Sequence, residues 1–180
     1  MRLPLLKFIP VLLLSAFTLA ACDTEDPYSI PPPDFSTVPT AFDYSEADPI
    51  EIEEGVEAYI LDEGEGYATV NRRDQIAIHI TVRTLDDEII YSSSANSNPE
   101  PDQMAVSNIQ RVNAVQIYER RVPAYTPGLQ AGLLGMKEGE RRTIIVSPEK
   151  GYEGVSESSY TYQFRDDTLQ YDIVLSSISY

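Results

Sequence analysis

An alternating stretch from Gln75 to Thr84 restricts the fold of this chain more than any other feature. Branched apolar residues occupy every second position, at Ile76, Ile78 and Ile80, with Val82 completing the set, and mostly polar residues stand between them. Successive side chains of a β-strand point to opposite faces of its sheet. The stretch therefore predicts a half-buried strand with one apolar face.

Further strands are predicted on both sides of this one. Val56–Leu61 precedes it, and Arg142–Ser147 and Leu169–Ile178 follow it. The last of these places Leu169, Tyr171, Ile173 and Leu175 on one face. Because adjacent strands mostly lack the spacing of a βαβ unit, we expect an antiparallel sheet.

One helix is predicted between these strands. Thr126 is a suitable N-cap, Pro127 suits the first helical position, and Gly139 follows the expected last turn. Its apolar residues recur at helical spacing, at Leu129, Leu133 and Met136. A stripe of this kind has to be buried against the sheet, so the fold class is α+β.

The amino terminus has the pattern of an export signal. A short basic region with Arg2 and Lys7 precedes the apolar run Phe8–Leu19, and small residues lead to Cys22. Leu-Ala-Ala-Cys at this place resembles the bacterial lipobox, which implies cleavage after residue 21 and acylation of Cys22, the only cysteine of the chain. An ordinary signal peptide followed by a chance cysteine is the alternative.

Residues 22–54 are predicted to form an acidic, proline-rich tether between this lipid anchor and a folded domain at 55–180. From Asp23 to Asn71 there are 14 acidic residues and no Lys or Arg, within a chain of 29 acidic and 13 basic residues. This charge excludes nucleic acid as a partner. The cluster Asp23–Asp26 resembles both a surface-export and an inner-membrane retention signal, so the predicted address is the bacterial cell envelope, with the outer membrane favoured.

The run from Tyr125 to Tyr152 resembles the core signature of FKBP-type peptidyl-prolyl isomerases. The matching positions are Gly128, Gly132, Met136, Gly139, Arg142, Pro148 and Tyr152. Asp74–Ser93 and Thr168–Leu175 are similar to two further family segments. The resemblance covers about 125 residues and implies a twisted antiparallel β-sheet wrapped around one short α-helix, with an insertion at about 94–124.

The resemblance also implies a cleft that binds the substrate proline. Carried over position by position, its residues are Ile80, Ile90, Tyr91, Tyr125, Thr126, Leu129, Tyr152 and Tyr171. Ile80 and Ile90 replace the usual tyrosine and phenylalanine, and Tyr91 replaces the usual aspartate. His79 is the only histidine, and in the family the matching residue is structural. The alternative is that the listed residues form the ordinary core of a β-rich fold, and for Ile80 and Leu129 the two interpretations are about equally supported.

Two functions follow from these patterns as hypotheses. The resemblance implies a lipid-anchored prolyl isomerase that acts on proline-containing protein or peptide clients, touches the membrane through Cys22, and needs no cofactor or metal. The alternative is a catalytically weak or inactive module that keeps the fold for binding proteins, which the altered cleft favours. The two predict different outcomes of a proline-isomerisation assay.

Overall fold

The computed structural model of the protein describes residues 32–108, 115–117, 120–122 and 125–179. The strands of its main sheet are β1 (Ile50–Glu53), β2 (Val56–Asp62), β3 (Gln75–Thr84), β4 (Ile89–Ser92), β5 (Asp102–Ala105), β8 (Arg141–Val146) and β9 (Leu169–Ser179). A separate hairpin consists of β6 (Val115–Ile117) and β7 (Arg120–Val122). The helices are α2 (Pro127–Leu133) and four short 3-10 segments at Ala95–Ser97, Val106–Asn108, Pro148–Lys150 and Tyr162–Phe164.

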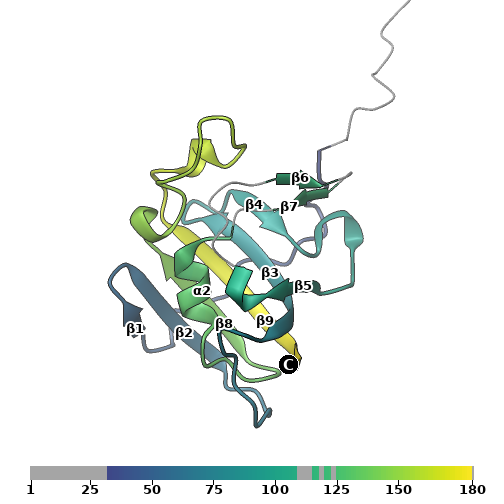
Figure 1. Ribbon diagram of the computed structural model, residues 1–180, viewed down its shortest axis with the longest axis vertical. Helices are drawn as coiled ribbons and strands as arrows, with labels where there is room; N and C mark the ends of the chain where they lie inside the picture. The colour runs from purple at the N-terminus through teal and green to yellow at the C-terminus, as the bar shows by residue number, and fades with distance from the viewer. Residues whose placement is uncertain (1–31, 109–114, 118–119, 123–124, 180) are drawn as a thin grey trace, which may run out of the picture. The chain divides into compact units, whose positions relative to one another are not determined.

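The main sheet is antiparallel throughout its described strands. Its strand order is β1-β2-β8-β9-β3-β4. Strand β5 pairs with the first half of β3, at Gln75–Ile78, and β4 pairs with the second half. The long strand β9 lies between β8 and β3, with α2 in front of the sheet (Figure 1). The predicted antiparallel α+β fold is thereby confirmed.

Helix α2 begins where the sequence predicts. Thr126 has an extended backbone, and its side-chain oxygen accepts a hydrogen bond from the Leu129 amide at 3.1 Å, with Pro127 at the first helical position. Leu129 and Leu133 are fully buried against the sheet. The helix approaches β8 so closely that a Cβ on Gly132 would lie 2.6 Å from Ile144 Cδ1.

The helix is shorter than predicted. It ends at Leu133 rather than near Gly139, because Leu134 returns to an extended backbone and Gly135 adopts a φ of 79°. A positive φ of this kind favours glycine and commonly ends a helix. Met136 is fully buried as expected, but it belongs to the following loop and not to the helical stripe.

A buried ion pair supports the end of α2. The Arg142 guanidinium lies 2.6 Å from Glu140 Oε1 and donates a hydrogen bond to the Gly132 carbonyl at 2.6 Å. Glu140 in turn accepts a hydrogen bond from the Lys137 amide at 2.9 Å. Carbonyls at a helix C-terminus lack partners within the helix, so Arg142 from β8 supplies one and fixes the loop that follows.

Residues 34–47, here called the strap, pack across the sheet on the side opposite α2. At one end the Tyr44 ring lies 4.7 Å from that of Tyr59 in β2, and Arg141 of β8 stands 4.6 Å from the Phe42 ring centroid. The Phe42 amide donates to Asp172 in β9, and the Pro39 carbonyl accepts a bond from Arg83 in β3. The purple strap passes behind the sheet in Figure 1.

The strap changes two expectations from the sequence. The folded unit begins near residue 33, within the region 22–54 assigned to the tether, and Ile50–Glu53 of that region forms the edge strand β1. The strand at 75–84 is also more than half-buried. Its polar face includes Thr81 and Arg83, which are only 6% and 2% exposed. The strap contacts Arg83 through the Pro39 carbonyl, and the Thr81 hydroxyl pairs with that of Ser92.

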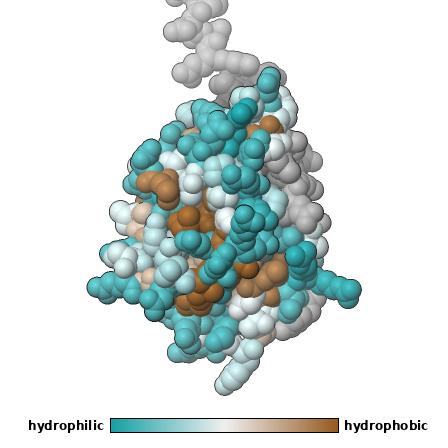
Figure 2. All heavy atoms as spheres, turned by 90° about the vertical axis from the view of Figure 1, so that its left-hand side faces the viewer, coloured by the Kyte–Doolittle hydropathy of each residue, from teal (hydrophilic) through white to brown (hydrophobic). Residues whose placement is uncertain are grey.

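The predicted insertion at 94–124 contains part of the regular structure. Strand β5 pairs with β3 over Gln75–Ile78, and the hairpin β6–β7 lies within the same segment. On the side where β1 lies, hydrophobic patches interrupt a mainly hydrophilic surface (Figure 2). Ile50 and Ile52 of β1 are among the exposed large hydrophobic residues, at 44% and 37%.

Candidate functional site

A row of side chains crosses the helix-facing side of the sheet. Tyr171 of β9 stands opposite Val82 of β3, which in turn stands opposite Tyr91 of β4. Directly opposed residues of antiparallel strands share a face. Tyr171 and Val82 are 0% and 1% exposed, and Tyr91 packs against the same hydrophobic cluster. The register therefore places two predicted site tyrosines on one face of the sheet, with Val82 between them.

Thr126 joins the start of α2 to this row. Its hydroxyl oxygen lies 2.9 Å from the Tyr171 hydroxyl oxygen, and both residues are fully buried. Burial raises the pKa of Tyr171, although the neighbouring Thr126 and Tyr152 hydroxyls act in the opposite direction. Leu129, one turn into the helix, is also fully buried within the cluster. The helix thus supplies both a polar contact and an apolar floor.

Tyr152 follows the short 3-10 helix Pro148–Lys150, which begins directly after β8. The Tyr152 side chain is 0% exposed. Its hydroxyl has no hydrogen-bond partner among the described residues. Burial raises the pKa of Tyr152 well above its usual range, and the neighbouring Tyr171 hydroxyl raises it further. A buried hydroxyl without a partner is destabilising by about 1–3 kcal/mol. It is also a donor available to a ligand.

Tyr91 lies at the partly exposed end of the cluster. Its hydroxyl donates a hydrogen bond of 2.5 Å to Asp102 Oδ2 on β5. Burial, then the Asp102 charge, raises the pKa of Tyr91. The same two causes, in the same order, raise the pKa of Tyr125, which stands just before Thr126. Neutral tyrosine hydroxyls and one carboxylate therefore share this end of the site.

The structure gathers all eight predicted residues on the helix-facing side of the sheet. Five of them belong to the buried hydrophobic cluster: Ile80, Ile90, Leu129, Tyr152 and Tyr171. Tyr91 and Tyr125 pack against this cluster, and Thr126 bonds to Tyr171. Six of the eight are less than a tenth exposed, the exceptions being Tyr91 and Tyr125.

The sequence prediction missed four members of this site. Val155 and Phe164, from the segment after Tyr152, are 7% and 6% exposed within the same cluster, and Tyr160 packs against it. The aromatic spacing of Tyr160–Phe164 was a signal that could have indicated burial. Asp102 carried a weaker signal, because it shares its strand face with the buried Met104, two residues further on.

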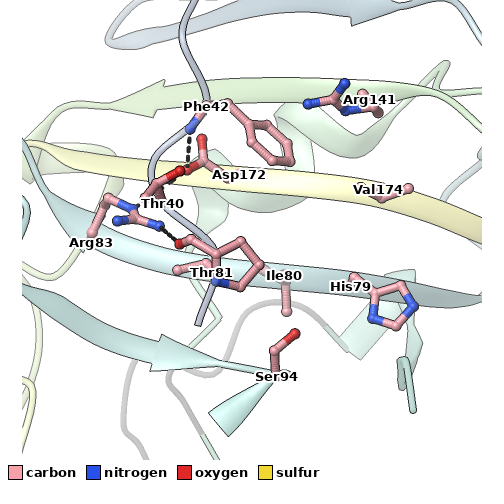
Figure 3. Close-up of a pocket in the computed structure, with 11 residues that line it drawn as sticks. Thr40, Phe42, His79, Ile80, Thr81, Arg83, Ser94, Arg141, Asp172 and Val174 are labelled. Carbon is pink, nitrogen blue, oxygen red and sulfur yellow. Dashed lines mark hydrogen bonds and ion pairs between the residues drawn. The ribbon is translucent and has the colours of Figure 1, made fainter. Parts of the chain in front are cut away.

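A separate cavity of about 250 Å³ lies on the opposite face of the sheet, beneath the strap. It is bounded by Phe42 of the strap and by outward-facing residues of three strands, among them His79, Asp172 and Arg141 (Figure 3). Of the eight predicted site residues only Ile80 borders it. His79 thus lies away from the tyrosines, on the strap side.

The described residues offer neither a cluster of metal ligands nor a helix that could cross a bilayer. No group of three or more His, Cys, Asp or Glu side chains in this part of the chain is placed to hold a metal ion. Among the same residues, none of the helices is both long and apolar enough to cross a bilayer. Cys22 lies outside the described residues.

Residues 66–176 match the family model of FKBP-type peptidyl-prolyl cis-trans isomerases. Solved structures with a similar fold include a peptidyl-prolyl cis-trans isomerase from Pseudomonas syringae pv. tomato, which has 15% identity and a TM-score of 0.53 over 73% of this chain and 81% of its own. The N-terminal domain of FKBP42 from Arabidopsis thaliana has 18% identity and a TM-score of 0.58 over 80% and 99%. FkpA from Escherichia coli has 19% identity and a TM-score of 0.52 over 70% of this chain and 49% of FkpA. The match therefore spans about half the length of FkpA.

Proposed function

The chain belongs to the FKBP-type peptidyl-prolyl cis-trans isomerase family, and we propose that its tyrosine-rich cluster binds and isomerises X-Pro amide bonds in protein clients. The uncatalysed rotation has a barrier of about 18–20 kcal/mol, because resonance gives the C–N bond partial double-bond character. A site that removes water from the amide and favours a twisted bond lowers this barrier without a nucleophile. Apolar and aromatic side chains are suited to that task.

The observation that carries the proposal is the buried Tyr152 hydroxyl. It lies close to the Tyr171 hydroxyl, which is paired with Thr126, and no described residue is positioned to form a hydrogen bond with it. A substrate carbonyl flanking the proline would be a suitable acceptor. A hydrogen bond to that carbonyl would orient the amide in a desolvated setting, where it is stronger than in water.

Entry of a client requires a rearrangement of the segment after Tyr152. Val155 and Phe164 pack in the same cluster as Tyr152 and Leu129. We propose that this segment moves outward when the proline enters, and that the apolar contacts it loses are replaced by contacts with the client. Movement of loops on binding is common in enzymes and limits many turnover rates.

The test is a proline-isomerisation assay with the full chain in detergent and a Leu-Pro test peptide. Acceleration that scales with protein concentration supports the enzyme. The matched control is Lys137→Ala, a loop change outside the cluster, which should leave the rate unchanged. The proposed isomerase activity is rejected if micromolar protein, shown to be folded by circular dichroism, does not accelerate the reaction.

A second candidate is a binding module that keeps the fold without accelerating isomerisation. The burial of six of the eight predicted site residues favours it, because contacts now made within the chain must be broken before a proline can enter. Binding of an unfolded, proline-containing client without acceleration of the test peptide would identify this function. Tyr91→Ala, at the partly exposed end, should then weaken binding.

We further propose that Cys22 is acylated and holds the domain at a membrane of the bacterial cell envelope, the outer membrane being favoured. The support is the basic, apolar and small-residue order of residues 1–22. Two or more acyl chains give stable anchoring, whereas one chain is marginal. Cys22→Ser should move the protein from the membrane to the soluble fraction. Retention of the variant after a high-salt wash would contradict the anchor.

A further inference from the structure

The cavity beneath the strap lies on the face of the sheet opposite the tyrosine-rich cluster and has polar residues of its own (Figure 3). Arg83 and Asp172 close one end of it, and they are only 2% and 4% exposed. Arg141 lies at the other end and is exposed to solvent. A volume of about 250 Å³ has room for about eight groups the size of a water molecule, at about 30 Å³ each. The cavity can therefore admit a small ligand from its exposed end.

Three residues at the exposed end form a row across the sheet. Val174 of β9 stands opposite Arg141 of β8 on one side and opposite His79 of β3 on the other. Directly opposed residues of antiparallel strands share a face. Because neighbouring strands are about 4.8 Å apart, the backbones of Arg141 and His79 are separated by about 10 Å. Two side chains that can donate hydrogen bonds thus flank an apolar floor (Figure 3).

The Arg141 guanidinium contacts the strap through its face. It lies 4.6 Å from the centroid of the Phe42 ring, which also lines the cavity. Asp62, opposite Arg141 on β2, accepts a hydrogen bond from the Gly64 amide. Arg141 itself has no ion pair within the described part of the chain. Stacking on a ring leaves the N–H groups along the guanidinium edge available for two parallel hydrogen bonds to a carboxylate.

The charges around the cavity favour a ligand with a single negative charge. Asp172 accepts hydrogen bonds from the strap and from β8, and it is also paired with Arg83. Arg83 is paired with Asp87 as well. Among the described residues, Arg141 therefore carries the uncompensated charge of the lining, in a chain whose net charge is −16. A second negative charge on the ligand would be repelled by Asp172 at the buried end.

We propose that this cavity binds a small carboxylate with a compact apolar body, such as an aromatic acid. The carboxylate accepts hydrogen bonds from the Arg141 guanidinium edge and from an N–H of His79. The apolar body lies against Val174, Ile80 and the Phe42 ring. The same chemical group can come from a free acid or from the C-terminal residue of a peptide. This site is separate from the proposed isomerase site and does not depend on it.

The test titrates the full chain, in a neutral detergent, with phenylacetate. Binding is followed by the chemical shifts of the His79 and Val174 backbone amides, which we expect to change and to saturate. Phenylacetamide retains the ring without the charge, and acetate retains the charge without the ring, so each should bind at least about fivefold more weakly. Inorganic phosphate should bind no more tightly than acetate. Equal affinities for phenylacetate and phenylacetamide, or for phenylacetate and phosphate, would overturn the inference, and so would shifts that do not saturate.

Arg141→Gln should weaken the binding of phenylacetate about three- to tenfold, and its amide spectrum shows whether the variant is folded. The matched control is Arg73→Gln, which removes the same charge from an exposed position outside the cavity and should retain the affinity. Equal weakening in the two variants would overturn the site, because it would reflect the net charge alone.

The tripeptide Ala-Ala-Phe and its C-terminal amide distinguish the two sources of the carboxylate. If the tripeptide acid binds more tightly than phenylacetate and its amide does not, the ligand is a peptide C-terminus. If the tripeptide acid binds more weakly than phenylacetate, the ligand is a free acid.

Discussion

The side-chain oxygen of Thr126 makes two contacts that join the helix to the sheet. It lies 2.9 Å from the Tyr171 hydroxyl oxygen and accepts a hydrogen bond from the Leu129 amide at 3.1 Å. The first contact fixes an aromatic residue of β9, and the second begins α2. One atom thus couples the start of the helix to the geometry of the candidate site.

Thr126→Val keeps the shape of this side chain and removes both contacts. We expect the free energy of unfolding to fall by about 1–3 kcal/mol, because a helix cap is lost and a buried amide and hydroxyl lose a partner. Thr126→Ser retains the oxygen and should lie within about 1 kcal/mol of the parent. Urea unfolding of the three proteins measures the difference. Equal losses in the two variants would show that packing of the methyl group matters more than the oxygen.

The strap predicts a second effect on stability, centred on Asp172. This buried carboxylate accepts hydrogen bonds from the Phe42 backbone amide, the Thr143 hydroxyl and the Gln170 side-chain amide. Its Oδ2 atom lies 3.4 Å from Arg83 Nε. Asp172→Ala should destabilise the fold by about 3 kcal/mol, since it leaves the Arg83 charge with less compensation in a buried setting.

Asp166→Ala is the control for this change, because the Asp166 side chain is 81% exposed. The free energy of unfolding of this variant should lie within about 0.5 kcal/mol of the parent's. Both variants are measured by urea unfolding of the full chain. The strap also predicts that deletion of residues 34–47 makes Arg83 and Asp172 accessible to solvent, which hydrogen exchange of neighbouring β9 amides would detect. Unchanged exchange would contradict a close packing of the strap.

The sequence predicts the elements of this fold well, because each has a local cause. Alternation over 75–84 specifies a strand, and Thr126 with Pro127 specifies the start of a helix. The predicted end of the helix was wrong because Gly135 and Gly139 are both suitable terminators, and the helix ends at the earlier one. Only the tertiary contacts of Arg142 with Gly132 and Glu140 distinguish them.

The strap could not be predicted from its composition. Residues 34–47 lack a helical or strand period, and they are fixed by single contacts with residues far along the chain, such as Phe42 with Asp172. The site shows the same division. Residues of the Tyr125–Tyr152 run were recognisable by their resemblance to the family signature, whereas Asp102 depends on the register of β5 against β3, which no local pattern specifies.

Tyr152→Phe separates a functional hydroxyl from a structural one. Because the Tyr152 hydroxyl has no hydrogen-bond partner among the described residues, its removal should leave stability unchanged or slightly higher. If it donates to the substrate, kcat/KM for a Leu-Pro peptide should fall about two- to tenfold, the value of one neutral hydrogen bond. Tyr59→Phe, at the strap side of the sheet, is the matched control for activity. An unchanged rate in Tyr152→Phe would remove this hydroxyl from the mechanism.

The buried tyrosines predict a dependence of stability on alkaline pH. Burial raises the pKa values of Tyr91, Tyr125, Tyr152 and Tyr171 in the folded protein above the ordinary value of about 10. Above about pH 10 the unfolded chain therefore releases protons that the folded chain retains. Stability falls wherever the folded state binds more protons than the unfolded state. The contribution is fully present below pH 10 and is lost as the pH rises above it.

Each such tyrosine should lower the free energy of unfolding by about 1.4 kcal/mol per pH unit above pH 10. Urea midpoints measured between about pH 8 and 11 give the slope, and the ultraviolet absorbance of tyrosinate should rise together with unfolding. Tyr171→Phe removes one of the four groups, so its slope should be shallower than the parent's, whereas their difference in stability should be constant below pH 10. Ionisation of all twelve tyrosines near pH 10 in a chain that stays folded would contradict the buried cluster.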